Sequence, residues 1–346
     1  MMKKIVDISG YGHSGKTAIS DYLKDFEDVF SFPNNVEFEL FRIQGGLMDL
    51  YYSIYVHWNL IRSRVRIHEF KKLVHRLGLV QDKRKISTLW NASGHGYNQY
   101  FNDKFIEISE KFIDELIIIK QVSFWPYDKF SDSKWKLFYE KVYVKVFKKI
   151  ILKELYYTDR TIFLKLVSKY IHDLFNEANS ENKPFVLLNN AFEPYNPSAC
   201  ASMIENSYSI IVDRDPRDIF ASLISSQNIF LPDFEKKAHI DEIKKKMIGF
   251  DDINKFITRI KIQKSNIINQ DTSMVLRIRY EDFILDHDKI SKKIKEHIGL
   301  NNLKMNQNIV FNPDNSKKNI GIWKKYRDMP EIKLIEKELA EYCYQK

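Results

Sequence analysis

The sequence predicts an α/β fold in which helices flank a central parallel sheet and a mostly helical insertion interrupts it. Two observations carry this prediction. A glycine-rich turn near the N-terminus lies between a short apolar run and a helical pattern, and later in the chain short apolar runs alternate with helical patterns. Runs that are apolar on both faces are typical of buried parallel strands, and strands that alternate with helices predict right-handed crossovers.

The glycine-rich turn is Gly10-Tyr11-Gly12-His13-Ser14-Gly15-Lys16-Thr17, a complete GxxxxGK[ST] loop. Residues 3–9 predict a strand before it and residues 18–26 a helix after it, which is the context that this motif needs. Such loops hold phosphate, because their backbone N–H groups approach its oxygens and the helix N-terminus adds positive potential. The sheet is therefore expected to be of the P-loop nucleotide-binding type. The residues assigned to phosphate binding are Gly12, His13, Ser14, Gly15, Lys16, Thr17 and Ala18.

Four further apolar runs predict the other strands, at 36–41, 184–189, 208–213 and 273–279. Helical patterns follow at 216–226 and 241–268, and a last helix begins at Pro330. We expect one domain over residues 1–346. Residues 47–170, rich in aromatic and basic side chains, form the helical insertion within it.

Composition limits the class of protein. The chain has 346 residues, 44% of them hydrophobic, and a formal net charge of +9, which suits anionic partners. Its two cysteines lie far apart, so we expect a reducing, cytoplasmic setting and no disulfide framework. No Cys/His cluster has zinc-ligand spacing, no apolar run is long enough to span a membrane, and no nucleic-acid motif is visible. Association with a membrane surface stays open.

A second candidate site lies in a strand–turn–helix segment at residues 209–222. Arg214 ends the apolar strand, at the edge where α/β sheets place ligands. Ser222 follows eight residues later, about two helical turns on. An arginine fork and a serine hydroxyl are both suited to a phosphate group.

This segment resembles the 3′-phosphate-binding element of sulfotransferases that use 3′-phosphoadenosine 5′-phosphosulfate (PAPS), in the spacing of Arg214 and Ser222 and in Pro216-Arg217-Asp218. Residues 275–283 resemble the late strand and Tyr-Glu-Asp turn of that family. Residues 316–324 resemble its C-terminal loop, which closes over the nucleotide. With the phosphate loop, four segments match in the family's order, and residues 47–170 lie outside the match.

The resemblance implies transfer of a sulfuryl group from PAPS to a hydroxyl, with no metal required. The family's lysine position in the phosphate loop carries His13 here. We transfer its role, stabilising charge on the departing oxygen, to Lys16, because the loop wraps the terminal group. Ser316 stands where the family often has arginine, so Lys317 or Lys318 must supply that charge. Trp323 would help to close the site.

The general base has three candidates. Glu37 and Glu39 alternate in the predicted strand at 36–41 and would therefore face one side. His95 lies in a polar, glycine-containing loop within the insertion. We rank Glu37 first, Glu39 second and His95 third, and Arg42 and Arg217 are candidates to orient the acceptor.

The acceptor and two rival functions remain open at this level. A sugar hydroxyl of a bacterial glycan, polysaccharide or glycolipid is preferred, bound by the insertion at 47–170, and a small alcohol is the alternative. One rival is an ATP-dependent kinase in which Asp213 holds Mg²⁺. The other is a catalytically silent nucleotide- or glycan-binding module.

Overall fold

The computed structural model describes residues 2–33, 36–82, 84–130, 132–192, 194, 196–225, 252–268, 270, 273–300 and 304–345. Two compact units make up the chain. Unit 1 combines Met1–Glu39 with Glu181–Lys346, and unit 2 is Leu40–Ser180.

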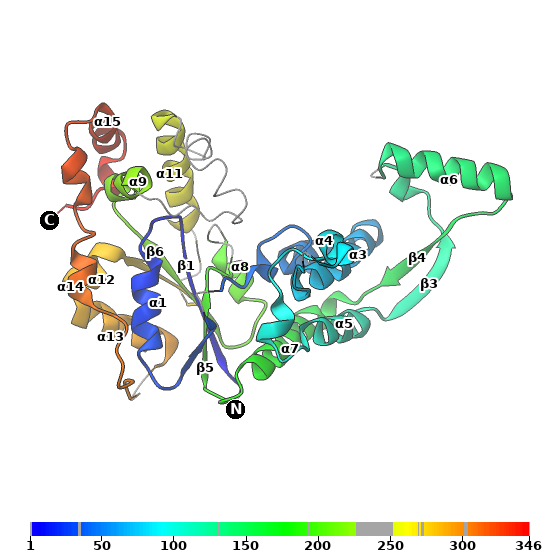
Figure 1. The fold of residues 1–346 in the computed structure, drawn as a ribbon, viewed down its shortest axis with the longest axis horizontal. Helices are drawn as coiled ribbons and strands as arrows, with labels where there is room; N and C mark the ends of the chain where they lie inside the picture. The colour runs from blue at the N-terminus through cyan, green and yellow to red at the C-terminus, as the bar shows by residue number, and fades with distance from the viewer. Residues whose placement is uncertain are drawn as a thin grey trace. The chain divides into compact units, whose positions relative to one another are not determined.

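Unit 1 is built on a parallel sheet that has five strands within the described residues, in the order β2-β5-β1-β6-β7 (Figure 1). The central strand, β1, pairs with β5 on one side and β6 on the other, so that Ile8 lies opposite Asn189 and Ile210. The strands are β1 (Lys4–Gly10), β2 (Val29–Ser31), β5 (Phe185–Asn189), β6 (Ser207–Asp213) and β7 (Val275–Arg279).

Helices pack on both faces of this sheet. On one face, Ile8 and Ile210 pack in a core with Leu23 and Phe283 of the covering helices, and on the other Ile211 packs against Ile267. Neighbouring residues of a strand point to opposite faces, so both faces bury side chains and the strands are almost continuously apolar. The helical segments are α1 (Lys16–Lys24), α8 (Pro197–Ala201), α9 (Pro216–Ser225), α11 (Ile253–Ile268), α12 (Tyr280–Leu285), α13 (His287–Ile298), α14 (Pro313–Lys317), η6 (Ile322–Tyr326), α15 (Pro330–Glu338) and η7 (Ala340–Tyr342).

Unit 2 is mainly helical. Its core is aromatic: the rings of Phe112 and Tyr170 stack at 4.5 Å, and Phe70 packs edge-on at 5.8 Å from Phe112. An antiparallel hairpin of β3 (Ile119–Phe124) and β4 (Leu152–Tyr157) carries α6 (Lys134–Phe147) between its strands (Figure 1). The other segments are α2 (Leu47–Leu50), η3 (Tyr51–Val56), α3 (Leu60–Gly78), α4 (Ile86–Asn91), η4 (Tyr97–Tyr100), α5 (Phe105–Leu116), η5 (Tyr127–Phe130) and α7 (Arg160–Ala178), and η2 (Glu39–Phe41) lies at the boundary with unit 1.

The expected α/β class, with a central parallel sheet flanked by helices, is confirmed. The strand predicted at 36–41 is wrong. Glu37 makes a single parallel bridge to Asn189, and the helical turn η2 begins at Glu39. Leu40 and Phe41 are both buried, and consecutive burial suits a helical turn better than a one-sided strand. The edge position belongs to β2, which the sequence did not indicate.

Two other expectations extend beyond the described residues. The helix predicted at 241–268 corresponds to α11, and residues 241–251 lie outside the description. The helix predicted at 216–226 corresponds to α9, and residue 226 lies outside it. The predicted insertion at 47–170 falls inside unit 2, and the single domain expected over residues 1–346 stays a prediction.

Candidate active site

The candidate site of unit 1 lies where the parallel strands end. The glycine-rich loop follows β1, Asn190 follows β5, Arg214 follows β6 and Tyr280 follows β7. Because parallel strands share one carboxyl edge, these residues gather at the edge where α/β sheets bind ligands.

The glycine-rich loop turns tightly between β1 and α1. Gly15, the residue before α1, has a φ of 85°, and His13 has a φ of 64°. The N–H of Ser14 donates to the carbonyl of Tyr11 at 3.0 Å. No side chain among the described residues caps the N-terminus of α1. The backbone at the start of this helix is therefore arranged as a phosphate-binding loop requires.

Arg214 joins three segments of the site. Its Nη1 donates to the carbonyl of His13 at 2.9 Å and to Ser222 Oγ at 3.0 Å, and its Nη2 donates to the carbonyl of Asn319 at 2.5 Å. Its guanidinium also lies over the ring of Tyr280, 5.2 Å from the centroid. The arginine and serine that the sequence singled out are thus in contact with each other and beside the phosphate loop.

Several buried polar atoms of this region have no hydrogen-bond partner among the described residues, among them the acceptors Asn190 Oδ1 and Glu281 Oε2. Two are donors: Ser14 Oγ, in the loop, and Arg214 Nε. A buried donor without a partner costs free energy, so each of these groups is suited to an incoming anion. At Gly12 an added Cβ would meet no atom within 4 Å, which shows open space beside the loop.

A pocket of about 280 Å³ borders the loop and the start of α1. Gly15, Thr17 and Asp21 line one side, and Tyr280, Ser316 and Asn319 are among the residues of the other. The Tyr280 hydroxyl donates to the carbonyl of Ser316 at 2.8 Å, which fixes the C-terminal segment beside the pocket.

Glu37, the first-ranked candidate for the base, is paired with the catalytic candidate Lys16. Lys16 Nζ lies 3.0 Å from Glu37 Oε1, and Asn190 Nδ2 donates to Glu37 Oε2 at 3.2 Å. Both side chains of the ion pair are partly exposed. The sequence analysis missed Asn190, although two asparagines directly after a buried strand are a signal for a residue at the ligand edge of the sheet.

Asp7 is a second group that the sequence analysis missed. It lies in β1 and is fully buried, and its carboxylate accepts from Ser9 Oγ, from the N–H of Ala191 at 2.7 Å and from that of Phe192 at 3.3 Å. Burial raises the pKa of Asp7 to about 6, while these hydrogen bonds and the charge of Lys16 oppose the rise. Asp7 therefore fixes the backbone that follows Asn190.

Burial also sets the charge of His13. It lowers the pKa of the imidazole, and the positive charges of Arg214 and Arg259 lower it further. The imidazole is therefore neutral at pH 7 and offers no positive charge to a phosphate.

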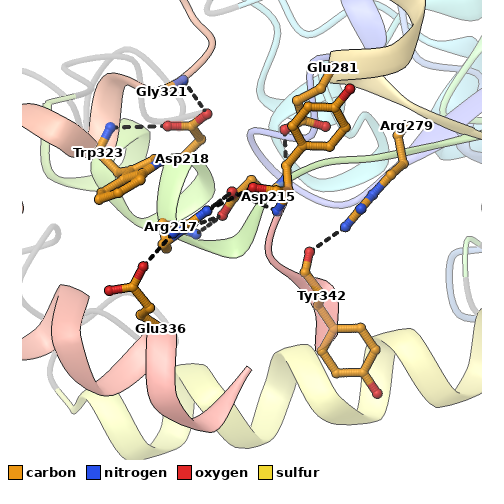
Figure 2. A network of polar contacts seen from close by, with 10 residues as sticks. Asp215, Arg217, Asp218, Arg279, Glu281, Gly321, Trp323, Glu336 and Tyr342 are labelled. Atoms are coloured by element: carbon orange, nitrogen blue, oxygen red, sulfur yellow. Dashed lines mark hydrogen bonds and ion pairs between the residues drawn. The ribbon is translucent and has the colours of Figure 1, made fainter. Parts of the chain in front are cut away.

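The Pro216-Arg217-Asp218 element fixes the C-terminal segment against α9 (Figure 2). Asp218 accepts from the N–H groups of Gly321 at 2.8 Å and Trp323 at 3.0 Å, and Arg217 lies over the Trp323 ring at 4.1 Å. Arg217 also pairs with Asp215, at 2.7 Å, and with Glu336. Arg217 is thus buried among partners that join α9 to the C-terminal segment, and its role in orienting an acceptor stays a prediction.

Glu281 completes this network. Its Oε1 accepts from the N–H of Asp215 at 2.8 Å, and burial raises its pKa to about 7 (Figure 2). The Tyr280-Glu281-Asp282 element thus contributes a ring beside Arg214 and a buried carboxyl that supports the turn after β6.

The remaining candidates are dispersed. Lys317 pairs with Asp314 at 3.0 Å and Lys318 Nζ lies 3.5 Å from Asn315 Oδ1, and both lysines are exposed on or beside α14. Glu39 begins η2, apart from the bridge that holds Glu37. His95 belongs to unit 2, where its Nδ1 lies 3.1 Å from Ser93 Oγ.

Asp213, which would bind Mg²⁺ in the kinase alternative, is paired with cationic side chains. Buried Lys264 forms an ion pair with it, and Arg277 Nη2 lies 3.9 Å from its Oδ2. Burial lowers the pKa of Lys264, and the charge of Asp213 opposes that shift. A carboxylate paired in this way is poorly placed to bind Mg²⁺. Among the described residues, no three His, Cys, Asp or Glu side chains are grouped as metal ligands.

Unit 2 has a pocket of its own, of about 720 Å³. His57, Trp58, Arg62, Asp159 and Arg160 are among its lining residues. Trp58 Nε1 donates to Thr158 Oγ1 at 3.3 Å, which holds the indole at the pocket wall. An aromatic face with cationic groups around it suits sugars and acidic ligands.

Comparison with known proteins gives matches among solved structures alone. No family model matches the sequence, and no curated protein matches it. The chain is similar to sulfotransferase STF1 from Mycobacterium tuberculosis, with 10% identity, a TM-score of 0.38, and coverage of 99% of this chain and 77% of that chain. It is similar to the sulfotransferase domain of the Synechococcus PCC 7002 olefin synthase, with 11% identity, a TM-score of 0.39, and coverage of 99% and 95%.

A third similar structure is the sulfotransferase domain from the curacin biosynthetic pathway, with 12% identity, a TM-score of 0.40, and coverage of 98% of each chain. All three are named as sulfotransferases or sulfotransferase domains. The case for function rests on the residues of the site.

Proposed function

We propose that this chain is a sulfotransferase that transfers the sulfuryl group of PAPS to a hydroxyl acceptor. The observation that carries the proposal is the Arg214–Ser222 pair, in which Arg214 also bonds the backbone of the phosphate loop at His13. A nucleotide with a 5′-phosphosulfate and a separate 3′-phosphate needs two adjacent anion sites. The loop and this pair supply such a combination.

The residues of the site fit this co-substrate. Ser14 Oγ and Arg214 Nε are buried polar atoms without partners among the described residues, one at each proposed anion site. The 3′-phosphate would accept hydrogen bonds from Ser222 Oγ and from the Arg214 guanidinium, whose present acceptors include the carbonyls of His13 and Asn319. The pocket beside Gly15 and Tyr280 offers room for part of the nucleoside.

Lys16 is the proposed electrophilic group. Sulfuryl transfer breaks the bond between sulfur and the bridging oxygen of the 5′-phosphate and forms one between sulfur and the acceptor oxygen, and negative charge develops on the departing oxygen. Neutral His13 offers no positive charge to balance it, whereas Lys16, at the start of α1, carries one. Glu37 takes the proton of the acceptor hydroxyl. The C-terminal side chains proposed to close the site are Lys317, Lys318 and Trp323.

The acceptor is proposed to be a sugar hydroxyl of a glycan, polysaccharide or glycolipid. Unit 2 is its proposed binding region, supported by the pocket at Trp58, where Arg62 and Arg160 add positive charge. Tryptophan faces stack on sugar rings, and arginine forks bind acidic substituents.

Thermal unfolding with different nucleotides tests the proposal. Adenosine 3′,5′-bisphosphate without Mg²⁺ should raise the melting temperature, because a ligand at 100 times its Kd stabilises by about 2.7 kcal/mol. AMP, which lacks the 3′-phosphate, should give a much smaller shift. Stabilisation by Mg-ATP and not by the bisphosphate would overturn the proposal and favour a kinase.

Two variants assign the effect to the site. Arg214→Ala should abolish the advantage of the bisphosphate over AMP. Ser222→Ala, a milder change that leaves the other Arg214 contacts in place, should reduce it by roughly tenfold in Kd, the value of one charge-assisted hydrogen bond. An unchanged advantage in both variants would refute this 3′-phosphate site. Bisphosphate binding without sulfate transfer across an acceptor panel would support the silent module instead.

A further inference from the structure

The hairpin arm of unit 2, residues 119–157, exposes far more apolar surface than a solvated helix and hairpin need. None of the residues of α6 is buried in the part of the chain that the structure describes. Trp135 is 83% exposed, Phe138 61%, Tyr139 65% and Val146 64%. Phe124 and Leu152, in the two strands, are exposed as well. A contiguous apolar surface of this kind marks an interaction site.

These side chains lie on one face of α6. Trp135, Phe138, Tyr139, Val142 and Val146 follow the spacing i, i+3, i+4, i+7 and i+11, which places them along one side of a helix. Another side of α6 faces the hairpin, because Glu140 forms an ion pair with Lys153 of β4. The apolar face is therefore a separate surface, which we call the α6 face.

Lysines border the α6 face. Lys134, Lys141 and Lys145 are exposed, and their spacing of i, i+7 and i+11 places them in a row along one flank of the helix. Over residues 119–157 the sequence has nine lysines and four acidic residues. The arm is strongly basic even within a chain whose net charge is +9.

We propose that the α6 face binds the surface of an anionic membrane, with α6 lying in the plane of the lipid headgroups. Tryptophan and tyrosine favour the membrane–water interface, and flanking lysines pair with anionic headgroups. A second copy of the chain is a poorer partner, because it would bring two lysine-rich arms together. No helix among the described residues is long and apolar enough to cross a membrane, so the contact is with one surface. This inference does not depend on the proposed reaction.

Flotation with lipid vesicles tests the inference on the full chain. Vesicles of equal parts phosphatidylglycerol and phosphatidylcholine should carry the protein, and pure phosphatidylcholine vesicles should carry much less. Trp135→Ser should weaken binding to the mixed vesicles about tenfold, the value of one large apolar side chain. Trp90→Ser is the matched control: Trp90 lies on α4 and is 77% exposed, and its loss should change binding less than about twofold.

A charge variant tests the second half of the inference without touching the apolar residues. Replacing Lys134, Lys141 and Lys145 together with glutamine should weaken binding to the mixed vesicles roughly 100-fold, because each lysine near such a surface contributes about 1 kcal/mol. All replaced residues are exposed, and far-UV circular dichroism checks the fold of each variant.

Three outcomes would overturn the inference. One is the absence of binding to mixed vesicles, and another is equal binding by Trp135→Ser and Trp90→Ser. The third is a lipid-free dimer in sedimentation velocity that Trp135→Ser dissociates, with no vesicle binding, which would assign the α6 face to a second copy of the chain.

Discussion

Lys16 and Glu37 have opposite proposed tasks although they form an ion pair. Lys16 is to stabilise the departing phosphate oxygen, and Glu37 is to accept a proton from the acceptor. At 3.0 Å the two groups neutralise each other, and Asn190 holds the second oxygen of Glu37. In the proposed reaction an incoming phosphosulfate would compete with Glu37 for Lys16, and the freed carboxylate could then face the acceptor. The pair would thus link nucleotide binding to activation of the base.

Glu37→Gln should separate the two tasks. The amide keeps the shape of the side chain and its contact with Asn190 but accepts no proton, so turnover should fall by about 10²- to 10⁴-fold. The Kd for adenosine 3′,5′-bisphosphate should not rise, because the variant removes the charge that competes with the nucleotide for Lys16. Steady-state sulfate transfer and nucleotide titration measure the two quantities.

Glu39→Gln is the matched control for this experiment. Glu39 begins η2, whereas the ion pair with Lys16 is formed by Glu37, so we expect this variant to keep its turnover. Full activity of Glu37→Gln together with a large loss in Glu39→Gln would transfer the role of base to Glu39. If turnover falls in neither variant, His95 becomes the leading candidate for the base.

The residues that the sequence predicted are those with a local pattern. The phosphate loop and the Arg214–Ser222 spacing each lie within one strand–turn–helix segment, where chain geometry alone brings the groups together. Asn190 and Asp7 escaped prediction because their contacts join segments that are distant in the chain: Asp7 accepts from the N–H of Ala191, 184 residues away, and Asn190 donates to Glu37, 153 residues away. A polar residue in an apolar strand signals burial, and it does not name the distant partner.

At the scale of elements, the strand predicted at 36–41 shows how a short apolar pattern misleads. Phe38, Leu40 and Phe41 are buried, as expected of a core segment, but Leu40 and Phe41 lie in a helical turn. Short apolar runs do not distinguish strand from helix by periodicity, whereas β5 and β6 were predictable because their flanking turns and continuous apolar runs agree. The junction of α1 with the loop was predictable too, because its motif demands strand, turn and helix.

Gly15→Ala should show how tightly the loop is fitted to α12. Gly15 has a φ of 85°, and a Cβ there would lie 2.4 Å from the buried ring of Tyr280. Strain at positive φ costs roughly 1 kcal/mol and overpacking adds about 1–3 kcal/mol, so the free energy of unfolding should fall by about 2–4 kcal/mol. Urea denaturation measures this loss.

Gly12→Ala is the control within the same loop. A Cβ at Gly12 would meet no atom within 4 Å, so its effect on unfolding should stay below about 1 kcal/mol. Equal destabilisation by the two variants would contradict the contact between Gly15 and Tyr280 and would point to a general intolerance of the loop.

At the scale of the whole molecule, the sequence predicted unit 1 better than unit 2. The strands of unit 1 are buried on both faces of one sheet, so their apolar composition and their alternation with helices indicate a parallel sheet. The hairpin arm lacks this information: β3 and β4 are separated by α6, the apolar residues of β3 are exposed, and in β4 Leu155 is buried whereas Leu152 is exposed. Apolar residues that contact an external partner form the same sequence pattern as buried residues. The sequence therefore predicts a helical insertion over the arm.

Stability against pH provides a test at the same scale, because two buried carboxyl groups of unit 1 have raised pKa values. Burial raises the pKa of Glu281 from 4.5 to about 7 and that of Asp7 from 3.8 to about 6. At pH values between the unfolded and the folded pKa of each group, the folded chain keeps a proton that the unfolded chain has released. Stability is therefore unaffected below the unfolded pKa values, decreases as pH rises through the window, and is lowest above the folded pKa values.

Glu281→Gln should remove most of this decrease. The amide oxygen can still accept from the N–H of Asp215 but the side chain carries no titrating proton, so the variant's stability should change less between pH 5 and pH 8. The difference in free energy of unfolding between wild type and variant should change by on the order of 3 kcal/mol over the titration of Glu281, in favour of the variant at high pH. Urea denaturation at several pH values measures it, and Asp328→Asn, at an exposed carboxyl, is the control that should follow the wild type. Parallel curves for wild type and Glu281→Gln would mean that the pKa of Glu281 is the same in the folded and the unfolded chain, which would contradict the effect of burial on this carboxyl.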